Sequence, residues 1–104
     1  MNLDKLTAVT LALNRRFPAW NHPFQIMTRL IEESGELAEQ VNHFEGSETK
    51  RKKYGEPDKT KMAKEVMDVL RCALQVAMYY GIESELESTI ERSYQRAKAE
   101  GLIQ

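Results

Sequence analysis

The sequence predicts an all-α domain, in which four helices form a bundle-like fold with one long loop between the second and third helices. Apolar residues recur at helical spacing along most of the chain, and no stretch shows the sustained alternation of a β-strand. Prolines and most glycines fall between these apolar segments. At 104 residues, the chain is long enough for one hydrophobic core but not for two, so we expect a single domain over residues 1–104.

The first two helices are delimited by prolines and a glycine. An apolar stripe predicts a first helix over about residues 3–17, which Pro18 ends. Pro23 suits the first turn of a second helix, because a backbone N–H is not needed there. Gly46 is typical of a helix end, so the second helix is expected to run to about residue 45.

The second half of the chain begins with a segment that has no helical periodicity. Residues 47–58 are predicted to form the long loop, and Asp58 suits the cap of the helix that follows. Two further helices are expected over about residues 59–80 and 83–100, each followed by a glycine. The helix over 59–80 is the most apolar around its circumference, so we expect it to be the most buried.

Composition excludes several classes of protein. The hydrophobic content of 41% and the charged content of 30% are globular values. A net charge of -1 gives no general attraction to nucleic acid or to an anionic membrane. Polar residues interrupt the longest apolar region, and no secretory leader is evident. The lone Cys72 fits a reducing compartment, so the sequence favours a cytoplasmic protein.

Two pairs of acidic residues at i,i+3 spacing lie inside apolar helical segments. The first pair is Glu33 and Glu36, and the second is Glu65 and Asp68. Two other acidic pairs in the chain share this spacing, so the spacing alone carries little information. Position around the helix is the better criterion.

A helical projection at about 100° per residue separates these acids from their neighbours. Glu33 falls at the edge of the apolar side of its helix and Glu36 lies one step outside, whereas Glu32 and Glu39 project towards solvent. Glu65 falls inside the apolar side of the next helix, with the second acid of its pair at the margin. The two helices therefore each offer a carboxylate pair to one half-buried seam.

Carboxylates beside an apolar core need a positive partner, because their desolvation costs several kcal/mol. Carboxylate oxygens without a nearby His or Cys cluster favour a hard cation such as Mg²⁺ or Mn²⁺ over Zn²⁺. A surface ion-pair network is the alternative, and the residues alone leave both open. The basic side chains that could neutralise the acids in such a network are Arg29, Lys61, Lys64 and Arg71.

At these residues the chain resembles the MazG-like nucleotide pyrophosphohydrolases, all-α enzymes related to MazG, the dimeric dUTPases and the dCTP pyrophosphatases. Their signature is an E-x-x-E pair on one helix and an E-x-x-D pair on the next. Here these are Glu33-Ser-Gly-Glu36 and Glu65-Val-Met-Asp68. The wider run Glu-Glu-Ser-Gly-Glu-Leu-Ala-Glu is similar to that of the family, and the likeness extends over roughly residues 17–80.

The resemblance implies a metal-dependent reaction. Glu33, Glu36, Glu65 and Asp68 are expected to hold Mg²⁺, with Mn²⁺ as a substitute, and the metal to bind the phosphates of a nucleoside triphosphate. Water would attack the α-phosphorus and leave a nucleoside monophosphate and pyrophosphate. Glu33 and Glu36 are the candidates for the base that accepts the proton of that water.

A homodimer or homotetramer is expected on two grounds. The apolar circumference of the helix over residues 59–80 exceeds what three neighbouring helices can cover. The family resemblance points in the same direction.

The last helix departs from the family pattern. Family members often carry a Lys and an Asn one turn apart on this helix, which contact phosphate or sugar, whereas Glu91 and Gln95 lie near those places here. Arg92 and Arg96 are close by and are the candidates for phosphate contacts. Substrate preference is therefore open.

Aromatic residues precede the first acidic pair, where related enzymes place aromatic groups around the base. Trp20, His22 and Phe24 could form a stacking wall for a nucleobase. They could equally staple a loop over the end of a small core, and both interpretations remain open.

The alternative to an enzyme is a non-catalytic helical interaction module that uses the acidic seam as a docking face. A nucleic-acid-binding role for the basic run Lys50–Lys53 is weaker, because such runs in loops are usually solvated. Release of pyrophosphate from a panel of nucleotides, with and without Mg²⁺, separates these hypotheses.

Overall fold

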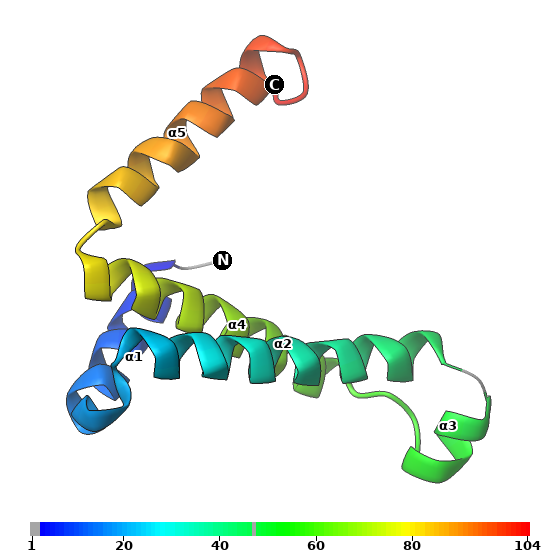
Figure 1. Cartoon of the computed structure of the whole chain (residues 1–104). Helices are drawn as coiled ribbons and strands as arrows, with labels where there is room; N and C mark the ends of the chain where they lie inside the picture. Colours follow the sequence, from blue (N-terminus) through cyan, green and yellow to red (C-terminus); the bar gives the residue numbers. More distant parts are fainter. Residues whose placement is uncertain (1–2, 47) are drawn as a thin grey trace.

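The computed structural model describes residues 3–46 and 48–104 and confirms the all-helical fold (Figure 1). Over these residues the chain forms five α-helices and one short 3-10 turn, and no strand. The elements, in chain order, are α1 (Leu3–Arg16), η1 (Pro18–Trp20), α2 (Pro23–Glu45), α3 (Glu48–Tyr54), α4 (Lys59–Tyr80) and α5 (Glu83–Ala99).

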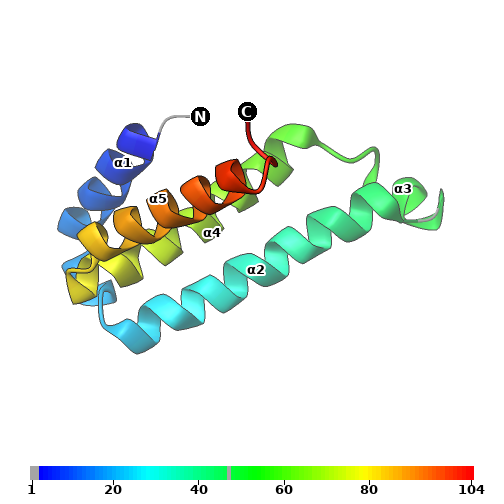
Figure 2. The same cartoon turned by 90° about the horizontal axis from the view of Figure 1, so that it is seen from above.

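The two long helices α2 and α4 lie side by side, and α1 packs against α4 (Figures 1 and 2). Both long helices have capped starts: the His22 ring accepts a hydrogen bond from the Phe24 N–H at 3.2 Å, and the Asp58 carboxylate accepts one from the Thr60 N–H at 2.8 Å. Helix α4 ends at Gly81, whose φ of 65° is left-handed and favours glycine. None of the described helices has the length and apolar character needed to cross a membrane.

Buried side chains are few in the part of the chain that the structure describes, and half of them are polar. Helix α4 supplies most of them, which confirms the prediction that it is the most buried helix. The hydrophobic members of this set are Ile26, Cys72 and Ala77, and the polar members are Thr10, Asp68 and Gln75. Burial raises the pKa of the Cys72 thiol, so this cysteine is a packing residue rather than a nucleophile.

A short chain of polar contacts joins the three packed helices at the end where α2 begins. The Gln75 amide of α4 donates to Asn14 Oδ1 of α1 at 2.8 Å. Arg29 of α2 donates to Gln75 Oε1 at 3.5 Å. The Asn21 amide donates to the Asn14 carbonyl oxygen at 3.1 Å, which ties η1 to the same place. These hydrogen bonds satisfy polar groups that would otherwise be buried at a cost.

The predicted long loop was wrong in one respect, because it contains helix α3. The seven residues of α3 are exposed and carry no apolar stripe, so periodicity gave no signal for them. Good helix formers and an acidic residue in the first turn, with basic residues in the last, favour a helix here. Ser47, the first residue of the predicted loop, lies outside the described residues.

Helix α5 forms where it was predicted but does not pack along the other helices. It leaves α4 at Gly81 and runs away from the layer of α1, α2 and α4 (Figure 1). Of its residues, Ala97 alone is half-buried and the others are exposed. The radius of gyration of 17.0 Å is correspondingly large, since a compact domain of this length has about 13 Å.

Candidate metal centre

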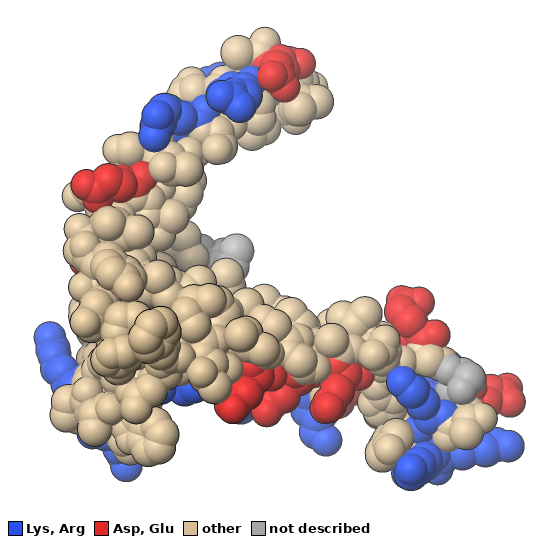
Figure 3. All heavy atoms as spheres, viewed as in Figure 1, with Lys and Arg blue, Asp and Glu red and all other residues tan. Residues whose placement is uncertain are grey.

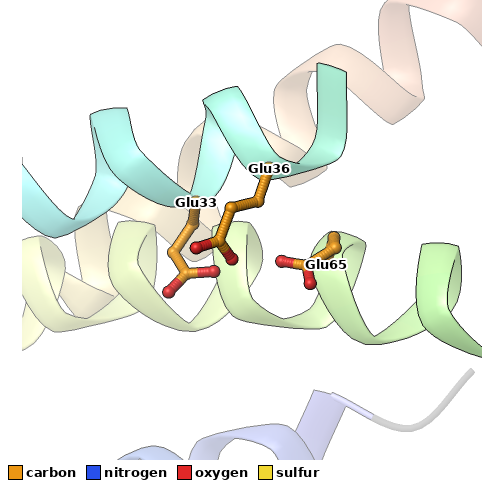
Figure 4. Close-up of side chains that lie close together, drawn as sticks. All are labelled: Glu33, Glu36 and Glu65. Carbon is orange, nitrogen blue, oxygen red and sulfur yellow. The ribbon is translucent and has the colours of Figure 1, made fainter. Parts of the chain in front are cut away.

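Three carboxylates from two helices converge on the seam between α2 and α4. Glu33 and Glu36 lie one turn apart on α2, and Glu65 faces them from α4 (Figure 4). One carboxylate oxygen from each residue lies within 4.8 Å of the others. The i,i+3 spacing on α2 and the close packing of α2 on α4 together create this cluster, which we call the acidic cluster.

Burial and like charges act in the same direction in the acidic cluster, because both disfavour ionised carboxylates. Burial, followed by the charges of Asp68 and Glu36, raises the pKa of Glu33 from its ordinary 4.5 to about 7. Burial also raises the pKa of Glu65, together with a hydrogen bond to Glu36. The Oε2 atoms of Glu33 and Glu65 are buried and have no hydrogen-bond partner among the described residues. A positive partner would relieve both the repulsion and the lost hydrogen bonds.

The acidic cluster fits a divalent cation. Oxygens that share one ion lie no more than about 4–5 Å apart, which is twice the metal–oxygen distance. Glu33, Glu36 and Glu65 meet this condition and offer oxygen ligands alone. Such a ligand set suits a hard ion such as Mg²⁺ or Mn²⁺.

Asp68 differs from the three glutamates because protein cations already neutralise it. The Lys64 ammonium lies 2.9 Å from its Oδ2 and the Arg71 guanidinium 3.6 Å from its Oδ1. The hydrogen bond to Asp68 raises the pKa of Lys64. Asp68 does not belong to the group of converging oxygens, although its charge raises the pKa of Glu33. The alternative ion-pair network therefore applies to Asp68 and does not extend to the acidic cluster.

The sequence projection ranked the two acids of α4 in the wrong order. It placed Glu65 inside the apolar side and Asp68 at the margin, but Asp68 is only 6% exposed and Glu65 is half-buried. The buried side of α4 also includes the polar Gln75, so it is rotated away from the centre of the apolar residues. The projection was right for α2, where Glu32 and Glu39 are exposed.

The aromatic residues lie beside the start of α2. The ring of His22 caps this helix and contacts the Phe24 ring at 5.2 Å, so His22 has a structural task. Trp20 and Phe24 are 58% and 78% exposed. They line an open hollow of about 280 Å³ together with Gln25, Thr28, Arg29 and Glu32. These exposed rings are compatible with stacking on a nucleobase. They do not support the alternative, in which they would hold a loop over the end of the core.

From the sequence, Arg29 and Arg71 were expected only to neutralise acidic residues. In the structure, both lie between the aromatic residues and the acidic cluster. Arg29 lies one turn before Glu33 on α2, and Arg71 follows Asp68 by three residues on α4. Arg29 Nη1 is buried without a hydrogen-bond partner among the described residues. Both arginines line a second hollow of about 340 Å³, with Leu13, Phe17, Trp20, Asn21 and Gln75. Arg29 could have been identified from the sequence, because it is a basic residue four positions before the first acid of the E-x-x-E pair.

The basic residues of α5 lie away from the acidic cluster. Figure 3 shows Lys and Arg on α5 at the top of the view and Asp and Glu along the lower edge of the α2–α4 layer. Arg92 and Arg96 are exposed. At about 100° per residue, Arg92 lies nearly opposite the apolar side of α5. A single chain does not bring these two residues to the cluster, and their contact with substrate stays a prediction.

The fold and the cluster together define an all-α protein with a carboxylate site on the seam of two long helices. A comparison with protein families matches residues 22–99 to the MazG nucleotide pyrophosphohydrolase domain. The chain belongs to this family, which confirms the resemblance of its acidic motifs and indicates a nucleotide pyrophosphohydrolase. Neither curated proteins nor solved structures give a significant match to the chain.

Proposed function

We propose that this protein hydrolyses nucleoside triphosphates, deoxy or non-standard ones included, to nucleoside monophosphate and pyrophosphate in a Mg²⁺-dependent reaction in the cytoplasm. The observation that carries the proposal is the convergence of three carboxylates from α2 and α4 within the region that matches the family. Two of these carboxylates retain a buried, unpartnered oxygen. Such oxygens are suited to bind a cation, and a bound cation is in turn suited to bind the phosphates of a nucleoside triphosphate.

The residues that would hold the ion are Glu33, Glu36 and Glu65. When bound, Mg²⁺ neutralises the phosphates and lowers the pKa of a water molecule. The carboxylate of Glu33 or Glu36 orients the attacking water and accepts its proton while the water oxygen bonds to the α-phosphorus. The bond from the α-phosphorus to the bridging oxygen breaks, and pyrophosphate leaves with the bonding electrons.

Asp68 acts on this reaction through its neighbours. Lys64 and Arg71 fix its carboxylate in one orientation, and its charge raises the pKa of Glu33. The added negative charge favours a cation at the acidic cluster, as outer residues do at other metal sites. We therefore propose Asp68 as a metal-site residue that positions the ligands.

The rest of the substrate has two candidate contact regions. Arg29, whose Nη1 lacks a partner, and Arg71 border the cluster and are suited to phosphate oxygens. The exposed rings of Trp20 and Phe24 are suited to stack on the base. Arg92 and Arg96 on α5 would reach the phosphates only if another copy of the chain brings them there.

Pyrophosphate release from a panel of ribo-, deoxyribo- and modified nucleoside triphosphates tests the proposal. We expect release with Mg²⁺ for at least one nucleotide and none after EDTA treatment. A Glu65→Gln variant should be inactive, and Glu39→Gln on the exposed side of α2 is the matched control. If no nucleotide yields pyrophosphate and Mg²⁺ does not change the melting temperature, the acidic seam is instead a docking face of an interaction module.

A further inference from the structure

Helix α4 buries a polar side chain, Gln75, where α1 and α2 pack against it. Gln75 is only 4% exposed. Its amide has a partner on each side: Nε2 donates to Asn14 Oδ1 of α1 at 2.8 Å, and Oε1 accepts from Arg29 Nη2 of α2 at 3.5 Å. An apolar residue would fill this place without needing either partner, because only a buried polar group must be hydrogen-bonded. The buried glutamine therefore calls for a role beyond packing.

The neighbours of Gln75 determine which end of its amide meets Arg29. Asn14 Nδ2 donates to Met78 Sδ at 3.8 Å, which leaves Asn14 Oδ1 to accept a hydrogen bond. An acceptor at this place selects the donor end of the Gln75 amide, so Nε2 faces α1 and Oε1 faces α2. Asn14 thus orients Gln75, and Gln75 in turn orients Arg29.

The charge of Arg29 is not cancelled by this arrangement. In the part of the chain that the structure describes, no carboxylate forms an ion pair with Arg29, whereas Arg71 lies 3.6 Å from Asp68 Oδ1. A carboxylate at position 75 would also hold the Arg29 guanidinium, but it would compete with an anionic ligand for it. A neutral amide fixes the direction of the guanidinium and leaves its charge available.

Arg29 is also in the right place for an anion that meets the acidic cluster. It lies four residues before Glu33 on α2, which is about one helical turn. Its Nη1 has no hydrogen-bond partner among the residues described. A phosphate oxygen would satisfy this donor with a charge-assisted hydrogen bond.

We infer that Gln75 and Asn14 are positioning residues, which hold the Arg29 guanidinium ready for a phosphate group of the bound nucleotide. Neither residue touches the ligand itself; Gln75 acts through Arg29, and Asn14 acts through Gln75. The inference rests on the proposed function for the identity of the anion. It adds a link from α1, which carries none of the acidic residues of the site, to the phosphates.

Fluorescence of Trp20, the single tryptophan of the chain, measures nucleotide binding without hydrolysis. Trp20 lines the same hollow as Arg29 and Gln75. The probes are the α,β-methylene analogues of the four common ribonucleoside triphosphates, with Mg²⁺, because a carbon replaces the bridging oxygen of the bond that breaks. We expect Gln75→Leu to raise the dissociation constant about tenfold, as for loss of a hydrogen bond to a charged group.

A double-mutant cycle distinguishes positioning from packing. Arg29→Gln should weaken binding at least as much as Gln75→Leu, and the double variant should bind no more weakly than Arg29→Gln alone, because Gln75 acts through Arg29. Asn14→Leu should weaken binding, whereas Asn14→Asp keeps the acceptor and should bind like the wild type. The matched control is Thr10→Val on α1. Thr10 is buried and its hydroxyl donates to the Leu6 carbonyl oxygen at 2.8 Å, so this variant loses a hydrogen bond outside the chain of amides and should leave binding unchanged.

Failure of this inference and failure of the proposed function are distinguishable, because binding and hydrolysis are measured separately. Analogue binding that depends on Gln75 and Arg29, without release of pyrophosphate from the parent nucleotides, would support the inference and refute the proposed function. Unchanged binding by Gln75→Leu, in a chain that releases pyrophosphate, would overturn the inference alone. An equal loss in Thr10→Val, or a double variant weaker than Arg29→Gln, would also overturn it, since Gln75 would then act through packing. A wild-type chain that binds none of the analogues would overturn both.

Discussion

The acidic cluster and helix α5 break the usual pattern of a globular protein in opposite ways. In the acidic cluster, Glu33 and Glu65 each have a buried oxygen that finds no hydrogen-bond partner among the described residues. Helix α5 exposes large apolar side chains such as Ile90 to solvent. In a globular protein, both a buried charge and a large exposed apolar surface call for an explanation. We propose that the partner of the acidic cluster is a cation, whereas the exposed apolar side of α5 shows that helical periodicity alone does not ensure burial.

The largest expected effect is on pyrophosphate release, which depends on the acidic cluster. Glu36→Gln and Glu65→Gln should each lower the rate of pyrophosphate release by more than about 100-fold, beyond the loss that is typical of outer residues around a metal. Each substitution removes the charge of an oxygen ligand but keeps the size of the side chain. Initial rates at saturating Mg²⁺ measure the effect, and circular dichroism confirms the fold.

The matched control for these variants is Glu39→Gln, one turn further along α2. Glu39 is exposed, and a solvated charge contributes little, so the rate should stay within about threefold of wild type. Equal damage by Glu39→Gln and Glu65→Gln would show that the acidic cluster is not the site.

Asp68→Asn is expected to have a smaller effect than loss of a glutamate ligand. Asp68 is held by Lys64 and Arg71 and acts on the cluster through its charge, so we expect a loss of about 10–100-fold. Its metal requirement should shift to higher Mg²⁺ concentration, which a titration of the rate with Mg²⁺ measures. An unchanged Mg²⁺ dependence would show that Asp68 has a purely structural role.

The comparison also separates what local sequence predicts from what it does not. Within each helix, the sequence alone gives the i,i+3 spacing and the apolar neighbours of Glu33, Glu36 and Glu65. The family motif then indicates that the two helices contribute to one site. Helix α3 was missed because a short exposed helix has no apolar periodicity. The order of burial of Glu65 and Asp68 depends on how α4 is rotated against α1 and α2, which the sequence of α4 alone does not determine.

The direction in which α5 leaves α4 also could not be predicted from apolar periodicity. Its apolar stripe predicts a helix, which the structure confirms, but the stripe itself is exposed. The stripe does not say whether the cover comes from the same chain or from another. The short connection at Gly81 and Ile82 directs α5 away from α2 and α4, and this depends on backbone geometry at a single turn.

Thermal stability tests the missing cation directly. A ligand that binds only the native state stabilises it by mass action, so saturating Mg²⁺ should raise the melting temperature by about 5–10 °C, and EDTA should reverse the rise. Glu65→Gln should lose most of this shift, whereas the control Glu39→Gln should keep it. An unchanged melting temperature at millimolar Mg²⁺, with and without nucleotide, would contradict the metal site.

The last expected effect is the pH dependence of the metal-free protein. The pKa of Glu33 is about 7 in the folded chain and near its ordinary 4.5 when unfolded, so between these values the native state binds more protons. The free energy of unfolding should therefore fall as pH rises from about 4.5 to 7, since the slope follows the difference in bound protons. Urea titrations in EDTA at several pH values measure it.

Glu33→Gln provides the control for this pH dependence. Glutamine cannot ionise, so the fall in stability should become shallower, with the remainder due to the raised pKa of Glu65. Mg²⁺ should oppose the fall, because it replaces the protons that the native carboxylates would otherwise take up, and its effect should therefore grow as pH rises. If stability instead rose between pH 4.5 and 7 in the wild type and fell in Glu33→Gln, the cluster would not be a site of carboxylate repulsion, and the need for a cation would lose its physical basis.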